Sequence, residues 1–201
     1  RGSGHGDSRQ LVFAPASVQE CADLTYLAFD LAEKYRTISI ILSDGGISQM
    51  IEKVVLPEAK EHDNKKFDWA ITGHKAVDEP KVKVTNLDRS MPYDEYDRMT
   101  KAKFKAMHDN EQRWEDFQTE DAELILVAIG ISSRVCKSAV REARAAGIKL
   151  GLIRPITVWP FPAKAFDKLP ENCKALATVE MSLSAQMAQD VILASKNKLP
   201  V

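Results

Sequence analysis

The fold is decided by an apolar run in the second half of the chain, residues 123–130, which reads ELILVAIG. A continuous run of this kind is typical of a strand buried on both faces of a parallel sheet. A helical pattern follows it through Ala146, with Ser132 or Ser133 as the predicted N-cap and Gly147 after its end. The stretch therefore predicts one β–α unit of an α/β domain.

The same alternation continues towards the end of the chain. Residues 148–154 and 175–179 are two further predicted strands, Pro162 opens a short helix, and residues 184–195 form another helix. Alternating β and α elements indicate a mostly parallel, doubly wound sheet. We place this domain at residues 121–201.

Residues 1–57 predict a strand, a helix and a strand. The strands are the apolar runs LVFAPA (11–16) and ISIIL (38–42), and Ser17 with Glu20 forms a capping box at the start of the helix between them. Two parallel strands cannot cover both faces of a sheet by themselves. We therefore expect an incomplete parallel sheet, which either a longer chain or a partner would complete, and we favour a truncated chain.

Residues 58–120 have a different character, with 12 Lys plus Arg and 15 Asp plus Glu. Aromatic and methionine residues nevertheless recur at helical spacing over 93–118, which predicts one long amphipathic helix. We interpret 58–120 as a charged connector that lays this helix on a domain surface.

The composition excludes several classes of protein. The 201 residues carry 28 Lys plus Arg against 29 Asp plus Glu, so no overall field favours nucleic acid or an anionic membrane. No apolar run approaches the ~18 residues of a spanning helix. The three cysteines lie far apart and suggest no disulfide framework, so we predict a cytoplasmic protein. The histidines lack the spacing of metal ligands, so we predict no metal site.

The glycine-flanked residues near the start are the first candidate site. Gly4, His5, Gly6 and Asp7 precede the first strand, and an imidazole beside a carboxylate can exchange protons near neutral pH. The alternative interpretation is a flexible chain end.

Asp44 and Gly45 are the second candidate site, because they follow the second predicted strand at the edge where α/β sheets bind ligands. We interpret this stretch as a turn whose backbone N–H groups could also meet a phosphate. Residues 130–134 (GISSR) hold a similar position after the next strand, where a capped helix start is favoured over an anion site.

The most distinctive string is RPITVWPFP, residues 154–162. Its three prolines stiffen what we predict to be an exposed apolar loop, and a rigid aromatic loses little conformational entropy on binding. The alternative is that its aromatic residues cover a sheet edge. The subunit-interface candidates are Arg154, Pro155, Trp159, Pro160 and Phe161.

Taken in order, these strings resemble a known family. The stretches at 4–7, 11–20, 41–45, 152–162 and 179–187 resemble the alpha subunit of 2-oxoacid:ferredoxin oxidoreductases. The resemblance is closest to the branched-chain type that acts on 3-methyl-2-oxobutanoate, the 2-ketoisovalerate enzyme.

The resemblance implies an oxidative decarboxylation that yields an acyl-coenzyme A and passes electrons through iron–sulfur clusters to ferredoxin. It implies that this chain supplies part of a thiamine-diphosphate pyrimidine-type domain followed by a transketolase C-terminal-like domain. Other subunits would hold thiamine diphosphate, Mg²⁺ and the clusters, so this chain alone would bind no cofactor, contain no catalytic residue and be inactive. Gly4, His5, Gly6, Asp7, Asp44 and Gly45 would lie near cofactor or substrate.

Two alternatives remain beside the resemblance. One is a non-catalytic interaction or assembly module of the transketolase C-terminal type. The other is a different thiamine enzyme, such as a dehydrogenase beta chain, which the strings at 4–20 and 154–162 fit less well.

Overall fold

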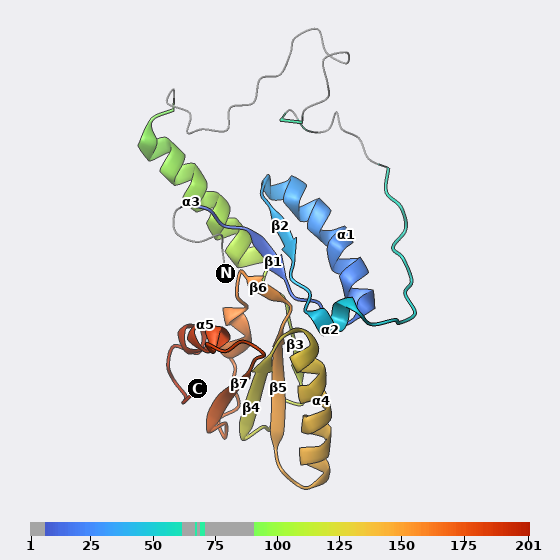
Figure 1. Ribbon diagram of the computed structural model, residues 1–201. Helices are drawn as coiled ribbons and strands as arrows, with labels where there is room; N and C mark the ends of the chain where they lie inside the picture. The colour runs from blue at the N-terminus through green and yellow to red at the C-terminus, as the bar shows by residue number, and fades with distance from the viewer. Residues whose placement is uncertain (1–6, 62–66, 68, 71–90) are drawn as a thin grey trace.

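The chain folds around two small β-sheets that share a junction. A computed structural model describes residues 7–61, 67, 69, 70 and 91–201. The first sheet has the strand order β2-β1-β6 and the second the order β3-β5-β4-β7. Figure 1 shows the first sheet beside α1 and α3, and the second sheet beneath it with α4 and α5.

The first sheet begins as predicted. β1 (Leu11–Phe13) and β2 (Ser39–Ile41) pair in parallel, and α1 (Val18–Tyr35) connects them. The backbone N–H of Glu20 donates to the Ser17 hydroxyl at 3.1 Å, and the Glu20 carboxylate accepts from the Ala16 N–H at 2.8 Å. The predicted cap therefore forms, with the glutamate reaching one residue further back.

The second sheet has the three predicted parallel strands and one more. β5 (Leu150–Pro155), β4 (Leu124–Ala128) and β7 (Ala175–Val179) run in parallel, and β3 (Trp114–Phe117) joins β5 antiparallel at the edge.

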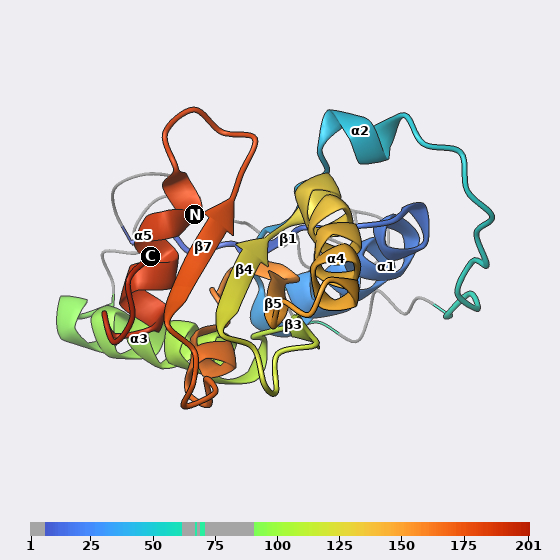
Figure 2. The same cartoon turned by 90° about the horizontal axis from the view of Figure 1, so that it is seen from below.

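Figure 2 shows α4 (Gly130–Ala145) and α5 (Gln186–Ala194) on opposite sides of the second sheet. The packing agrees with this placement. Ile125 and Val127 belong to a core with Val191 of α5, while Leu152 belongs to a second core with Val140 of α4. A short 3₁₀ helix, Ala163–Phe166, lies against α5. Among the described residues, no helix is long and apolar enough to cross a membrane.

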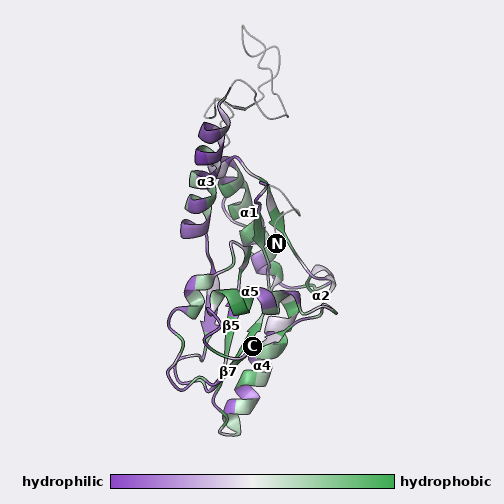
Figure 3. Ribbon diagram, turned by 90° about the vertical axis from the view of Figure 1, so that its left-hand side faces the viewer, coloured by the Kyte–Doolittle hydropathy of each residue, from purple (hydrophilic) through white to green (hydrophobic). Residues whose placement is uncertain are grey.

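The helix predicted at 93–118 is wrong at its C-terminal end. α3 covers Tyr93–Asn110, and Trp114–Phe117 is strand β3. The chain turns because the Glu111 carboxylate is drawn inward, where Tyr35, Lys34 and Arg113 bind it. Figure 3 shows that α3 is mostly hydrophilic, and Met107 is the one residue of this helix that is buried.

The exposed loop predicted at 154–162 is also wrong. This string forms the end of β5 and strand β6 (Thr157–Trp159), which pairs antiparallel with β1 of the first sheet. The Trp159 ring packs edge-on against Phe104 of α3 with centroids 6.4 Å apart, and Pro155 and Pro160 are buried. Phe161 stacks on Phe166 at 6.0 Å. The string therefore joins the two sheets within the chain.

Two local predictions differ from the structure. Neither Ser132 nor Ser133 caps α4, which begins at Gly130 without a cap from its own serines. The turn predicted at Asp44 and Gly45 is the short helix α2 (Gly45–Ser48), with Asp44 as its N-cap. Both differences have one cause, the position of the Asp44 carboxylate.

Candidate functional site

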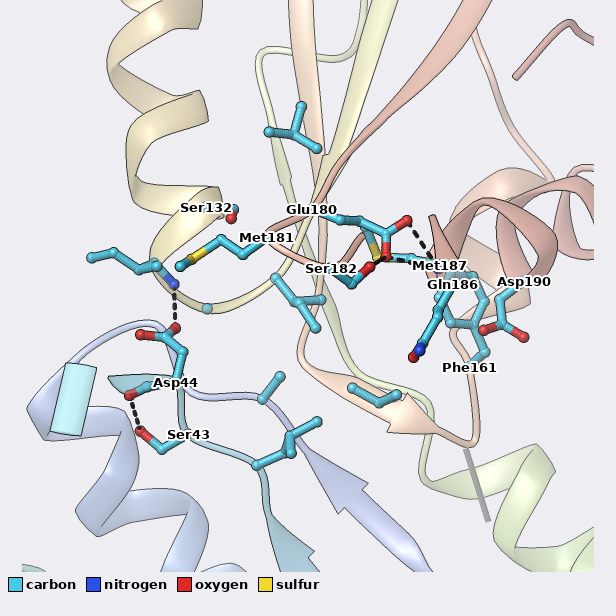
Figure 4. A pocket seen from close by; sticks show the side chains of 17 residues that line it. Ser43, Asp44, Ser132, Phe161, Glu180, Met181, Ser182, Gln186, Met187 and Asp190 are labelled. Carbon is cyan, nitrogen blue, oxygen red and sulfur yellow. Dashed lines mark hydrogen bonds between the residues drawn. The ribbon is translucent and has the colours of Figure 1, made fainter. Parts of the chain in front are cut away.

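A cleft of about 310 Å³ lies where the carboxyl ends of strands from both sheets meet. This is the edge at which open α/β sheets bind ligands. Figure 4 shows its lining side chains converging from both sheets. The lining residues lie at or just after the ends of β1 and β2 (Ala14, Leu42, Ser43, Asp44), β4 (Ile129, Gly130, Ile131, Ser132) and β7 (Val179, Glu180, Met181, Ser182), and are completed by Val158, Phe161, Gln186, Met187 and Asp190.

Asp44 holds one wall of the cleft together. Its Oδ1 accepts the Ile47 N–H at 2.9 Å, and its Oδ2 accepts the Ile131 N–H at 2.7 Å, at the start of α4. Gly130 has φ +54°, and a Cβ there would stand 2.4 Å from Oδ2 of Asp44. A glycine is therefore needed for the first sheet's carboxylate to reach the second sheet's helix.

Glu180 caps the helix on the opposite wall, α5. Its carboxylate accepts the Met187 N–H at 3.0 Å and the Ala188 N–H at 3.3 Å, at the start of α5. The Ser182 hydroxyl donates to it at 2.9 Å. A carboxylate at a helix N-terminus satisfies the amides that have no partner within the helix.

These contacts decide which ligands the cleft rejects. In this type of fold, the N-termini of α4 and α5 are the places where a phosphate would bind, and the chain's own carboxylates occupy both. The described residues that line the cleft include no Lys, Arg or His. The cleft therefore does not fit a diphosphate, and the anion-site alternative at residues 130–134 fails there.

A network of charges joins the sheets behind the cleft. The Arg154 side chain is 4% exposed and binds Glu20 through two hydrogen bonds, at 2.9 and 2.7 Å. Its Nε donates to Glu115 at 2.8 Å, and Lys137 donates to the same carboxylate at 2.5 Å. Burial raises the pKa of Glu115, but the bonds from Lys137 and Arg154 outweigh it and hold that pKa below its ordinary value.

A second link runs beside this network. Arg134 of α4 donates to Glu52 at 2.8 Å and to the Ala16 carbonyl at 3.3 Å. The Val18 N–H also donates to Glu52 at 3.0 Å. The N–H of Val18 and the guanidinium of Arg134 together lower the pKa of Glu52. Arg134 is thus engaged in joining the sheets.

The structure separates the two candidate sites that the sequence suggested. Gly4, His5 and Gly6 lie outside the described residues, while Asp7 is exposed and precedes the amino end of β1. Asp44 and Gly45 follow the carboxyl end of β2, which runs parallel to β1. Asp7 and Asp44 therefore lie at opposite ends of the first sheet.

Sequence reasoning missed Glu180 as a site residue, together with Asp190 and Phe161 as parts of the cleft wall. The available signal was position, because Glu180 directly follows the strand 175–179. Within the described part of the chain, no group of three His, Cys, Asp or Glu side chains is arranged to hold a metal ion.

Glu111 gives the fold a predictable response to acid. Its side chain is 3% exposed, and burial raises its pKa, but donors on Tyr35, Lys34 and Arg113 outweigh burial and hold the pKa below 4.5. A carboxylate with a lowered folded pKa stabilises the fold above its ordinary pKa, and this contribution is lost as the pH falls through the folded value.

We therefore expect Glu111→Gln to cost about 1–3 kcal/mol of unfolding free energy at neutral pH and less at about pH 3. Thermal melting at both pH values measures this, with Glu142→Gln on the exposed side of α4 as the control. An equal loss at both pH values would contradict the assignment.

Comparison with known proteins gives two family models that together cover almost the whole chain. Residues 4–119 match "Pyruvate flavodoxin/ferredoxin oxidoreductase, thiamine diP-bdg". Residues 122–201 match "Pyruvate:ferredoxin oxidoreductase core domain II". The boundary between the models falls in the segment between β3 and β4.

Curated relatives agree with these models. The ketoisovalerate oxidoreductase subunit VorB of Methanothermobacter marburgensis is 45% identical over 97% of this chain and 55% of its own length. The 2-oxoglutarate synthase subunit KorA of Methanocaldococcus jannaschii is 34% identical over 98% of this chain and 61% of its own length. The chain thus spans about half the length of the curated relatives it matches.

A solved structure shows the same fold. The 2-oxoglutarate:ferredoxin oxidoreductase of Magnetococcus marinus, with 2-oxoglutarate, coenzyme A and succinyl-CoA bound, matches with a TM-score of 0.73 and 20% identity. The match covers 98% of this chain and 40% of that one.

Proposed function

Since the chain belongs to the pyruvate:ferredoxin oxidoreductase family, we propose that it is part of a subunit of a thiamine-diphosphate-dependent complex that oxidises a branched-chain 2-oxoacid. In the proposed reaction the C1–C2 bond of the oxoacid breaks and C1 leaves as carbon dioxide. The acyl carbon gives up two electrons to ferredoxin and forms a thioester with coenzyme A.

One observation carries the branched-chain assignment. The chain is 45% identical to a ketoisovalerate oxidoreductase subunit over 97% of its own residues. It is 34% identical to a 2-oxoglutarate synthase subunit over 98% of them. The higher sequence identity to the ketoisovalerate subunit supports a branched-chain substrate for the complex as a whole, whichever subunit encloses the substrate.

The described residues support a division of labour between subunits. Thiamine diphosphate, when bound, supplies the carbanion chemistry of decarboxylation, and its diphosphate needs cations or free helix N-termini. The cleft between the sheets offers neither, because Asp44 and Glu180 occupy the helix ends. We propose that other subunits hold the diphosphate with its Mg²⁺ and the iron–sulfur clusters.

The chain's own contribution in this proposal is positional. Arg154, Arg134 and Asp44 fix the first sheet on the second, so the pyrimidine-type part is held in one orientation by the transketolase-like part. Three expectations stay predictions: the domain division at 57 and 120, a cytoplasmic location, and contact with cofactor or substrate. The residues of that contact are Gly4, His5, Gly6, Asp7, Asp44 and Gly45. The subunit-interface role of residues 154–161 also stays a prediction.

The test uses the full-length gene product, co-purified with its partner subunits. We expect bound thiamine diphosphate and iron–sulfur clusters, and coenzyme-A-dependent dye reduction with release of carbon dioxide from 3-methyl-2-oxobutanoate. The 201-residue chain alone serves as the control and should bind no thiamine diphosphate in calorimetry. A purified assembly without cofactor or activity would instead favour a non-catalytic assembly module.

A further inference from the structure

We propose that the cleft between the two sheets receives a lysine or arginine side chain from an apolar segment of a neighbouring polypeptide. The inference rests on the lining of the cleft and is independent of the reaction that the complex performs. The cleft combines an apolar interior, a negative charge on two opposing walls, and an apolar rim.

The interior is suited to an aliphatic stem. Leu42, Ile129, Val158, Phe161 and Met187 line the cleft, which measures about 310 Å³. The methylenes of a lysine or arginine can lie along such walls while the charged end reaches a polar group. Apolar area removed from water would supply much of the affinity.

The negative charge of the cleft walls favours a positively charged group at the end of the bound side chain. A helix N-terminus carries the equivalent of roughly +0.5 charge, so it offsets only about half of each carboxylate that caps it. Asp44 caps α4 and also the single turn of α2, so it keeps less of its charge than Glu180, which caps α5 alone. Together they leave a net negative potential across the cleft. The described lining residues contain no basic side chain to cancel it.

Asp44 also keeps capacity to accept a further donor. Each of its oxygens accepts one backbone N–H, from Ile47 and Ile131, and a carboxylate offers about four acceptor positions. An ammonium or guanidinium group in the cleft would therefore find acceptor positions on Asp44, beside the potential of Glu180.

The rim indicates a polypeptide rather than a free amine. The loop between β7 and α5 presents Met181 and Leu183 to solvent, at 76% and 107% relative exposure. Met181 also lines the cleft, so apolar surface continues from the interior to the outside. A small amine would leave this rim uncovered, whereas residues flanking a lysine would cover it.

The test uses three capped tripeptides as probes, with leucine on both sides of lysine, norleucine or glutamate. Binding to the chain is followed by the ¹³C-methyl NMR signals of Met181 and Met187, assigned by single substitution to leucine. We expect the lysine peptide to bind roughly tenfold more tightly than the norleucine peptide, the glutamate peptide to bind least, and added salt to reduce the difference.

Two variants and one small amine complete the test. Glu180→Gln should weaken the lysine peptide several-fold and leave the norleucine peptide unchanged, because glutamine can still accept the Met187 N–H. Ser132→Lys should abolish the preference for the lysine peptide over the norleucine peptide, because the added ammonium cancels most of the net negative charge of the cleft. Hexylammonium should bind at least about tenfold more weakly than the lysine peptide, since it cannot cover the rim.

Several results would overturn the proposal. Equal affinity for the lysine and norleucine peptides would show an apolar site without charge selection. Equal affinity for hexylammonium and the lysine peptide would indicate a small-amine site. The absence of shifts at both methionines in a folded chain would remove the cleft as the site.

Discussion

Replacing Arg154 by methionine is expected to lower the free energy of unfolding by about 1.5–3 kcal/mol, the contribution of a hydrogen bond to a charged group, because Glu20 and Glu115 are 30% and 34% exposed and water can reach them once Arg154 is gone. Arg154 is the guanidinium shared by Glu20 of α1 and Glu115 of β3, and it is almost completely buried. Methionine would fill much of the space but leave both carboxylates without their common donor.

The matched control is Arg141→Met. Arg141 is an exposed arginine of α4 whose guanidinium lies over the Phe117 ring, 5.3 Å from its centroid. Its replacement should cost about 1 kcal/mol or less. Urea denaturation at neutral pH measures both variants, and equal losses would show that the Arg154 network does not stabilise the junction.

Replacing Gly130 by alanine is expected to cost about 2.5–5 kcal/mol. The left-handed backbone at φ +54° adds about 1–2 kcal/mol for any residue with a Cβ. The new methyl would also displace the Asp44 carboxylate from the Ile131 N–H, and a hydrogen bond to a charged group contributes about 1.5–3 kcal/mol.

Gly147 provides the control for backbone strain alone. It has φ +82° and open space where a Cβ would stand, so Gly147→Ala should cost only the left-handed term. In a chain that already carries Asp44→Ala, the cost of Gly130→Ala in unfolding free energy should fall to that of Gly147→Ala, because no carboxylate is left for the new methyl group to meet. If Gly130→Ala and Gly147→Ala cost the same in the original chain, Asp44 does not need the space at Gly130.

The sequence predicted best those elements whose signals are local. The strand Ala175–Val179 and the cap of α1 at Ser17 were predicted where the structure has them, because a bounded apolar run and a capping box need only neighbouring residues. The parallel order of β4, β5 and β7 follows from the alternation of elements along the chain.

The missed elements depend on partners far along the chain. β3 and β6 have four and three residues, too few for a periodic pattern, and each is fixed by pairing with a distant strand. The aromatic residues of β3 also fit a helical arc, which favoured the wrong prediction.

The same limit applies to the cleft. Asp44 was singled out for its place after a strand, but its partner Ile131 is 87 residues away. The local sequence therefore indicated the position of Asp44 at the cleft but not its second role, as the cap of α4. Arg154 likewise finds Glu20 at a separation of 134 residues, which no local pattern of the string RPITVWPFP could reveal.

The most direct test of the proposed function is the ratio of kcat/KM values for three substrates, measured with the full-length protein in its purified complex. The assay is coenzyme-A-dependent dye reduction with 3-methyl-2-oxobutanoate, pyruvate and 2-oxoglutarate. We predict that 3-methyl-2-oxobutanoate exceeds each of the others by roughly tenfold or more, because pocket shape discriminates a branched chain from a methyl group and rejects a second carboxylate. A higher value for pyruvate or 2-oxoglutarate would contradict the branched-chain assignment, and silence with all three from a complex that holds thiamine diphosphate and clusters would contradict the reaction itself.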